Sequence, residues 1–238
     1  MDNAGFVALN RQAGLLKELE TVAQNIANMS TDGYRREGVV FSEFVVSGGR
    51  DSESISMGYA NGRASDLAQG ALRQTNGTFD LAIEGPGFFL VGTPDGDRLT
   101  RAGAFTPSAE GLLVAPDGAT LLDAGGAPVF VPGDAAQIAV GADGTVSADG
   151  NPIAQIGLWE AADPLAMTRD KGVRFDPGGV PVPVEDGRIL QGFVERSNVD
   201  PVRELTRMIE VQRAYELGQT FLDREDERVR SAVRTMGQ

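Results

Sequence analysis

The sequence predicts an α+β protein in which a long helix at each terminus flanks an all-β central domain. Apolar residues recur at helical spacing near both ends, and several of them lie seven residues apart. The central residues 51–200 hold 11 of the 12 prolines and 23 of the 31 glycines, which disfavours long helices there. Short apolar runs in the same region alternate with turn-forming residues, as they do in antiparallel β structure.

The N-terminal helix is expected to run from about Asn3 to Met29, within an N-terminal segment at residues 1–33. Apolar residues occur every three or four positions, which places them on one face of a helix. The helix should stop where turn formers cluster at residues 30–33. The apolar residues of this face are Phe6, Leu9, Ala13, Leu16, Leu19, Ala23 and Ile26; Leu9, Leu16 and Ala23 form a seven-residue series, as do Leu19 and Ile26.

The C-terminal helix is expected to occupy residues 201–236, within a segment at residues 197–238. Asp200 suits the N-cap because its carboxylate accepts hydrogen bonds from the first free amides, and Pro201 suits the first helical position. Such a helix is roughly 50 Å long, and with a heptad seam it needs a partner helix. The seam is Met208, Tyr215, Leu222, Val229 and Met236, and the other faces carry the expected ion pairs Glu204/Arg207, Glu210/Arg213 and Asp226/Arg230.

The region between the helices is expected to form an extended arm or linker at residues 34–78 and a β-domain at residues 79–196. Residues 47–66 are polar and glycine-rich, which is typical of a loop. The β-domain contains Asp-Gly pairs between strand-like runs, a strong hairpin signal. We therefore expect a small antiparallel barrel or sandwich. The strand-like runs are 79–83, 88–91, 112–115, 120–122, 129–131, 138–140 and 153–159.

Two lone helices on either side of one β-domain can pair with each other in a coiled-coil-like manner. A pair of this kind leaves apolar surface on its outside, which favours polymerisation. The alternative is that each helix is an ordinary amphipathic helix lying on its own domain. The length of the C-terminal pattern argues against that alternative, because it exceeds the surface that a domain of this size offers.

Composition excludes several classes of function. The chain has no cysteine and no histidine, which removes disulfides, thiolate metal sites, cysteine nucleophiles and the commonest general base. We expect no cofactor, no metal and no catalytic residue. The net charge of −13 comes almost entirely from residues 51–200, so we expect no binding to nucleic acid. No apolar run is long enough to span a bilayer, and the N-terminus lacks the pattern of a cleaved signal peptide.

Three segments have some features of a catalytic or ligand-binding site. The segment 143–150 alternates acidic and hydroxyl residues, but Ala154 stands where a calcium-binding EF-hand needs a glutamate. The segment Glu84–Gly87 has no lysine and precedes an apolar strand, unlike a phosphate-binding loop. Acidic pairs such as Glu185 and Asp186 sit at turns, and nothing singles them out as glycosidase carboxylates. All three are expected to be turns.

Four sequence blocks resemble the flagellar rod, hook and hook-associated proteins. The segment Asn25–Arg36 (NIANMSTDGYRR) is similar to the N-terminal signature of this family, which closes the first helix and leads into an extended arm. The central blocks are Leu81–Val91 (LAIEGPGFFLV) and Arg101–Thr106 (RAGAFT) with Gly111–Val114 (GLLV). The C-terminal block comprises Ser197–Asp200 (SNVD), Met208–Glu210 (MIE) and Gln212–Glu216 (QRAYE).

The resemblance implies a structural subunit of the bacterial flagellar basal-body rod that polymerises through its terminal helices and transmits torque. It also implies export through the flagellar type III apparatus without a cleaved signal, terminal helices that order on assembly, and partners that are copies of the chain or other axial subunits. An acidic middle that faces outward, with near-neutral ends packed inside, would fit this role. The residues expected at the assembly interface are Leu9, Leu16, Leu19, Ala23, Ile26, Asn28, Gly33, Tyr34, Met208, Tyr215, Leu222 and Val229.

Within the family, the opening residues 1–4 and the variant Asn28–Thr31 are more similar to proximal rod proteins than to distal ones. A distal rod or hook-type subunit is the alternative. Two other classes stay open from the residues alone: a hydrolase acting on the cell wall, and a secreted β-rich binding module. Gly33 is expected in a left-handed turn that ends the helix, so Gly33→Val should block assembly and spare the β-domain.

Overall fold

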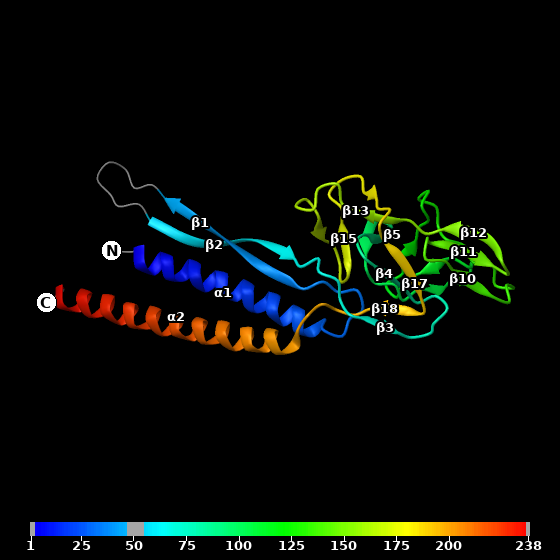
Figure 1. Cartoon of the computed structure of the whole chain (residues 1–238). Helices are drawn as coiled ribbons and strands as arrows, with labels where there is room; N and C mark the ends of the chain where they lie inside the picture. The colour runs from blue at the N-terminus through cyan, green and yellow to red at the C-terminus, as the bar shows by residue number, and fades with distance from the viewer. Residues whose placement is uncertain (1–2, 47–54, 237–238) are drawn as a thin grey trace. The chain divides into compact units, whose positions relative to one another are not determined.

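The computed structural model describes residues 3–46 and 55–236 of the chain. These residues form two compact units. Unit 1 comprises Met1–Met29, Arg36–Asp66 and Val199–Gln238, and unit 2 comprises Ser30–Arg35 and Leu67–Asn198. The chain therefore passes from one unit to the other four times, after residues 29, 35, 66 and 198. The predicted α+β class, with a helix at each end of a β-rich region, is confirmed (Figure 1).

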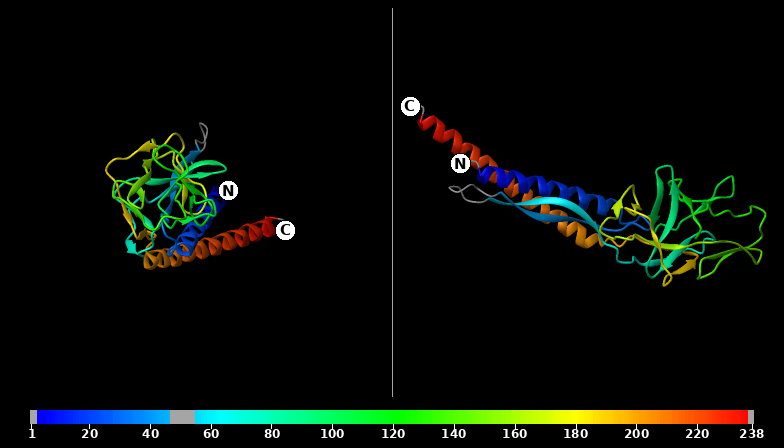
Figure 2. Two further views of the ribbon diagram at one scale, coloured as in Figure 1. Left: turned by 90° about the vertical axis from the view of Figure 1, so that its right-hand side faces the viewer. Right: turned by 90° about the horizontal axis from the view of Figure 1, so that it is seen from above.

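Unit 1 contains the two terminal helices, α1 (Asn3–Ala27) and α2 (Pro201–Met236). They lie side by side in the views of Figures 1 and 2. The predicted N-cap of α2 is confirmed, because Oδ1 of Asp200 accepts hydrogen bonds from the amides of Val202 at 3.0 Å and Arg203 at 3.2 Å. Within the described residues, neither helix has the length and apolar composition that crossing a bilayer requires.

Unit 1 also contains an antiparallel ribbon of two strands, β1 (Glu37–Val46) and β2 (Ile55–Ser65), which packs against α1. The prediction of a loop at residues 47–66 was wrong for the part that forms β2, and residues 47–54 lie outside the described residues. The arm expected at 34–78 thus consists largely of paired strands. Backbone pairing with β1 along the whole of β2 stabilises the ribbon, and a polar, glycine-rich sequence does not reveal such pairing.

Unit 2 holds all the other strands. Its largest sheet has nine strands and is centred on β5, which pairs with β6, β9 and β13. The described residues form three smaller sheets in this unit, β10-β11-β12, β17-β4 and β18-β3. The strands are β3 (Leu72–Gln74), β4 (Leu81–Glu84), β5 (Phe88–Thr93), β6 (Gly96–Thr100), β7 (Thr106–Pro107), β8 (Leu113–Val114), β9 (Thr120–Leu121), β10 (Ile138–Val140), β11 (Thr145–Ala148), β12 (Asn151–Gln155), β13 (Leu158–Glu160), β14 (Thr168–Arg169), β15 (Arg174–Asp176), β16 (Val182–Pro183), β17 (Arg188–Gln191) and β18 (Phe193–Glu195).

Strand β5 separates two apolar clusters because successive side chains of a strand point to opposite faces. Phe89 belongs to the larger cluster, where its ring meets the ring of Phe105 edge to face at 5.6 Å between centroids. Phe88 belongs to the smaller cluster and meets Phe175 in the same manner at 5.9 Å. The predicted apolar run at the start of β5 is therefore buried on both faces.

The predicted turns are present in unit 2. Asp-Gly pairs at 143–144 and 149–150 join β10 to β11 and β11 to β12, and both glycines have positive φ, 86° and 84°. The hydroxyl of Thr145 donates to the carboxylate of Asp143 at 2.8 Å, which lowers the pKa of Asp143. Gly85 and Gly87, with φ of 102° and 98°, form the tight turn that joins β4 to β5.

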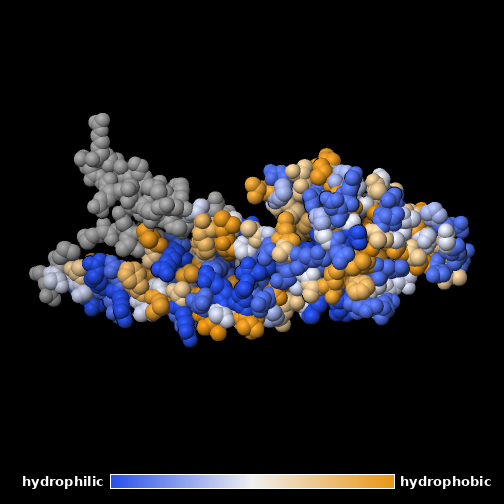
Figure 3. Space-filling model, viewed as in Figure 1, coloured by the Kyte–Doolittle hydropathy of each residue, from blue (hydrophilic) through white to orange (hydrophobic). Residues whose placement is uncertain are grey.

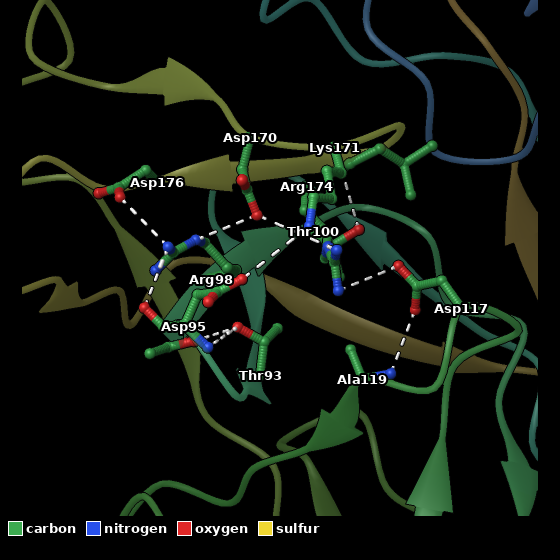
Figure 4. Close-up of polar contacts among 12 residues, drawn as sticks. Thr93, Asp95, Arg98, Thr100, Asp117, Ala119, Asp170, Lys171, Arg174 and Asp176 are labelled. Atoms are coloured by element: carbon green, nitrogen blue, oxygen red, sulfur yellow. Dashed lines mark hydrogen bonds and ion pairs between the residues drawn. The ribbon is translucent and has the colours of Figure 1, made fainter.

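Part of the acidic charge of unit 2 is neutralised in a cluster of ion pairs (Figure 4). Arg98 lies between Asp170 at 3.3 Å and Asp176 at 3.5 Å. Arg174 lies 3.3 Å from Asp117 and 4.0 Å from Asp170. The two arginine side chains are only 12% and 11% exposed, so these pairs are screened less than surface pairs are. The cluster links β6 to β15 and to the segments on either side of β15.

Candidate functional site

The segment Ser30–Arg35 lies in unit 2, although the residues on both sides of it belong to unit 1. The backbone of Gly33 has a φ of 74°, and its amide donates to the carbonyl of Glu195 at 2.7 Å. A Cβ at Gly33 would come within 2.2 Å of the backbone nitrogen of Ala102. The predicted left-handed conformation is confirmed, but its role differs. Gly33 permits a close approach inside unit 2, whereas α1 already ends at Ala27.

Tyr34 is buried in unit 2 with 0% of its surface exposed. The guanidinium of Arg169 lies 4.5 Å from the centre of its ring, within cation–π range. The same guanidinium donates through Nη2 to the carbonyl of Arg35 at 2.6 Å. The amide of Asn198 donates to the carbonyl of Tyr34 at 3.3 Å. Gly33 and Tyr34, which were predicted as subunit contacts, therefore contact their own chain.

One buried carboxylate joins two buried arginines next to Tyr34. Glu195 forms an ion pair through Oε1 with Nη1 of Arg35, and through Oε2 with Nη1 of Arg101 at 3.1 Å. Oε1 of Glu195 also accepts the amide of Gly70 at 2.7 Å. Arg35 and Glu195 are 0% exposed and Arg101 is 4% exposed. We call Arg35, Glu195 and Arg101 the buried triad.

The buried triad connects three segments that are far apart in the sequence. Arg35 donates to the carbonyl of Ala68 at 2.9 Å, and Arg101 donates to the carbonyl of Gly85 at 2.8 Å. Burial lowers the pKa of Arg101, and the nearby charge of Glu195 opposes this shift. The loss of one partner from an ion pair that is out of water is strongly destabilising. The triad therefore makes the stability of unit 2 depend on the segment Ser30–Arg35, which contains Arg35.

A second buried polar cluster joins the elements of unit 1. Asn25 of α1 donates through Nδ2 to the carbonyl of Glu37 at 2.8 Å and to Glu204 Oε2 of α2 at 3.1 Å. The amide of Glu37 donates to Oδ1 of Asn25 at 3.0 Å. Arg36 pairs with Glu204 at 2.5 Å. The consecutive arginines Arg35 and Arg36 therefore serve different units.

The contacts between α1 and α2 show that the helices are antiparallel. Asn25 meets Glu204, Glu18 forms an ion pair with Arg207 at 2.5 Å, and Gln12 donates to the carbonyl of Tyr215 at 2.9 Å. The hydrogen bond to Glu18 raises the pKa of Arg207. The predicted surface pair Glu204/Arg207 was wrong, because Glu204 is fully buried and Arg207 pairs with Glu18. The predicted pair Asp226/Arg230 is present, at 2.8 Å.

The predicted seam of α2 faces α1 over part of its length. Met208, Tyr215 and Leu222 are half-buried, whereas Val229 is 49% exposed. Gln12 pairs with Tyr215, and the two antiparallel helices have the same rise per residue. The first described residue of α1 therefore lies opposite about residue 224. Val229 thus lies beyond the N-terminal end of the described part of α1.

The predicted seven-residue series of α1 lies on the outside of unit 1. Leu9 is 57% exposed and Leu16 is 43% exposed, and Ala23 is exposed as well. Leu19 and Ile26 are half-buried. The sides of α1 that meet α2 and the β1–β2 ribbon instead carry the buried residues Gln12, Gly14, Thr21, Val22 and Asn25. We call Leu9, Leu16 and Ala23 the outer stripe.

Asn28 follows the end of α1, and its side-chain amide donates to the carbonyl of Gln24 at 2.8 Å. This bond satisfies one of the last free carbonyls of the helix. Figure 3 shows hydrophobic patches between hydrophilic ones along the surface of the helices. The apolar residues of α2 that are at least 47% exposed are Val202, Leu205, Ile209, Leu217, Phe221, Val229 and Val233.

Sequence reasoning missed Glu195 and Glu204. A charged residue that ends the apolar run of β18, at Glu195, is a weak signal of a buried ion pair. The sequence around Glu204 instead indicated an exposed residue, because Glu204 stands four residues from Asp200 in a helix start rich in charge.

Within the described ranges 3–46 and 55–236, no group of three or more acidic residues is placed to hold a metal ion.

Three family models match the chain in separate regions. A model described as flagella basal body rod protein matches residues 7–35, and one described as flagellar hook protein FlgE/F/G D1 domain matches residues 82–148. A model described as flagellar basal body rod FlgEFG protein C-terminal matches residues 190–235. The first match covers α1 and the segment Ser30–Arg35, and the second lies within unit 2. The third covers the last strands of unit 2 and α2.

Full-length comparisons agree with these matches. The chain is 39% identical to a flagellar basal-body rod protein FlgF of Caulobacter vibrioides, over 100% of this chain and 99% of that protein. It is 36% identical to a FlgF of Rhizobium meliloti over the same shares. Its identity to a flagellar basal-body rod protein FlgG of Bacillus subtilis is 30%, over 91% of this chain and 92% of that protein.

Proposed function

The chain belongs to the family of flagellar basal-body rod proteins and is a FlgF-like structural subunit of the rod, and we propose that it polymerises through α1 and α2 in the proximal part of the rod to transmit torque. Its partners in this role are further copies and other axial subunits. The subunit travels to the rod through the flagellar export apparatus. Its acidic unit 2 neither binds nucleic acid nor catalyses a reaction.

The outer stripe supports this proposal most directly. Leu9, Leu16 and Ala23 have the seven-residue spacing of a coiled-coil seam, yet they are exposed in the single chain. A contiguous exposed apolar surface on a helix marks an interaction site. Leu9 and Leu16 stay 57% and 43% exposed although α2 and the β1–β2 ribbon pack against α1, so the stripe is open to contact with another subunit.

Removing α1 should separate assembly from folding of unit 2. A chain that lacks residues 1–29 keeps Ser30–Arg35, so it retains every segment of unit 2. We expect cells in which this is the sole copy to be non-motile, while the purified protein keeps a cooperative unfolding transition at Trp159, the single tryptophan, in β13 of unit 2. Swarming assays and urea unfolding followed by fluorescence measure the two effects.

A longer deletion provides the matched control. Removing residues 1–35 also removes Arg35, and with it one arginine of the buried triad. We expect the urea midpoint at Trp159 to fall well below that of the shorter deletion. Normal motility of cells carrying the 1–29 deletion would contradict the proposed assembly role.

A further inference from the structure

A groove of about 680 Å³ lies between α1 and α2 within unit 1. Val7 and Leu15 of α1 and Leu217 and Phe221 of α2 provide much of its apolar lining. Gly218 and Gln12 also line the groove, and a Cβ at Gly218 would come within 2.5 Å of Nε2 of Gln12, so the glycine makes room for that side chain between the helices. Leu217 is 72% exposed and Phe221 is 47% exposed, so this apolar surface is open to a partner.

The groove and the outer stripe lie on adjacent sides of α1. At about 100° per residue, Leu9 and Leu16 point roughly 100–160° away from the groove residues Arg11 and Leu15 around the helix axis, and about 40–60° away from Gln12 at the near edge of the groove. One copy of the chain can therefore present its stripe and its groove at the same time. A contact between two different surfaces of identical chains is heterologous. Repeating such a contact builds an open helical filament, unless the rotation between neighbours closes the row into a ring.

The dimensions of the two surfaces agree. Leu9 and Leu16 lie seven residues apart, which is about 10 Å along a helix. The groove extends from Val7 to Leu15 on α1, a rise of about 12 Å. Two leucines at heptad spacing thus match the length of the groove, as apolar anchors of a helix do when it lies in a groove between two others.

The charges next to the two surfaces are also complementary. Among the described residues that line the groove, Arg11 is the one that carries a charge. On α1, Glu20 is exposed and stands four residues after Leu16, on the same side as the outer stripe. When a stripe lies in a groove, a carboxylate at this position can pair with the guanidinium of Arg11, whereas two copies joined stripe to stripe in parallel would place the two Glu20 carboxylates together.

We propose that the groove between α1 and α2 receives the outer stripe of a second copy of this chain, with Leu9 and Leu16 as the anchors. This assignment rests on the proposed polymerisation and names its contact surfaces. It makes the contact directional, because each copy offers a groove to one neighbour and a stripe to another. A row of copies then grows by repetition of a single contact.

Disulfide trapping tests this contact, and the native chain has no cysteine to interfere. Cells would carry the full chain with Leu16→Cys and Leu217→Cys as the sole copy, and their isolated basal bodies would be oxidised mildly. We expect a ladder of covalent multimers on non-reducing gels. Each single variant should stay monomeric on the same gels, because its cysteine would face a residue without a thiol. A matched pair, Leu16→Cys with Val202→Cys, should give no ladder, because Val202 lies about 22 Å along α2 from Leu217.

The outcomes separate this inference from the proposed function. Basal bodies that contain the double variant but show no ladder would overturn the inference, as would dimers from Leu16→Cys alone, since these would show stripes facing each other. Absence of the wild-type chain from basal bodies would contradict the proposed function itself. If the cysteines prevent incorporation, a pair of charged substitutions tests the contact instead. Leu16→Glu should block incorporation, and adding Leu217→Arg in the same chain should restore it. Failure of Leu217→Arg to restore incorporation would overturn the inference.

Discussion

Glu195→Gln is expected to lower the free energy of unfolding of unit 2 by about 3–5 kcal/mol. The carboxylate of Glu195 is the shared partner of two buried arginines, Arg35 and Arg101. Glutamine has nearly the same shape but carries no charge, so the substitution leaves both guanidiniums in the interior without a counter-charge. The loss of one partner from a buried ion pair costs far more than the pair contributes in net stability.

Urea unfolding followed by the fluorescence of Trp159 measures this effect in the full chain. Glu185→Gln is the matched control, because Glu185 is exposed and surface substitutions usually change stability by less than about 0.5 kcal/mol. A triple variant, Arg35→Met with Arg101→Met and Glu195→Leu, removes the charges together and should regain much of the loss. An unchanged midpoint for Glu195→Gln would contradict the structural role of the triad.

Gly33→Val is expected to destabilise unit 2 by about 2–5 kcal/mol, from left-handed strain and from overpacking. The left-handed φ of 74° is unfavourable for any residue with a Cβ, and here the Cβ would also meet the backbone of Ala102 at 2.2 Å. The expectation that this substitution spares the β-domain was wrong, because Gly33 is part of unit 2.

A substitution at a second glycine distinguishes the cost of backbone strain at Gly33 from the cost of the steric clash with Ala102. Gly118 has a similar φ of 84°, but a Cβ there would meet nothing within 4 Å. We expect Gly118→Ala to cost about 1 kcal/mol and Gly33→Ala to cost clearly more. Equal urea midpoints at Trp159 for the two alanine variants would show that contact with Ala102 is unimportant.

The features that could be predicted from the sequence are those with a short repeat. Heptad spacing located both helices, and the N-cap Asp200 gave the start of α2. Asp-Gly pairs gave the hairpins around β11. Each of these signals lies within a few residues of the structure that it determines.

The features that could not be predicted depend on contacts between distant segments. Strand β2 has the composition of a loop, and it becomes a strand because β1 pairs with it. Tyr34 looks like an exposed signature residue, and it is buried because Arg169, more than a hundred residues later, covers its ring. Glu204 resembles a surface residue of α2 until Asn25 and Arg36 bring their donors to it.

The outer stripe leads to the measurement that tests the central claim most directly: the amount of chain incorporated into isolated basal bodies. Leu9→Gln with Leu16→Gln changes two exposed residues of α1, so we expect normal folding but at least a tenfold loss of incorporation and no swimming. The matched control is Leu165→Gln with Val180→Gln, two residues of unit 2 that are 94% and 84% exposed. We expect this pair to incorporate normally. Wild-type incorporation of the Leu9/Leu16 variant would contradict the claim that the outer stripe of α1 assembles the rod.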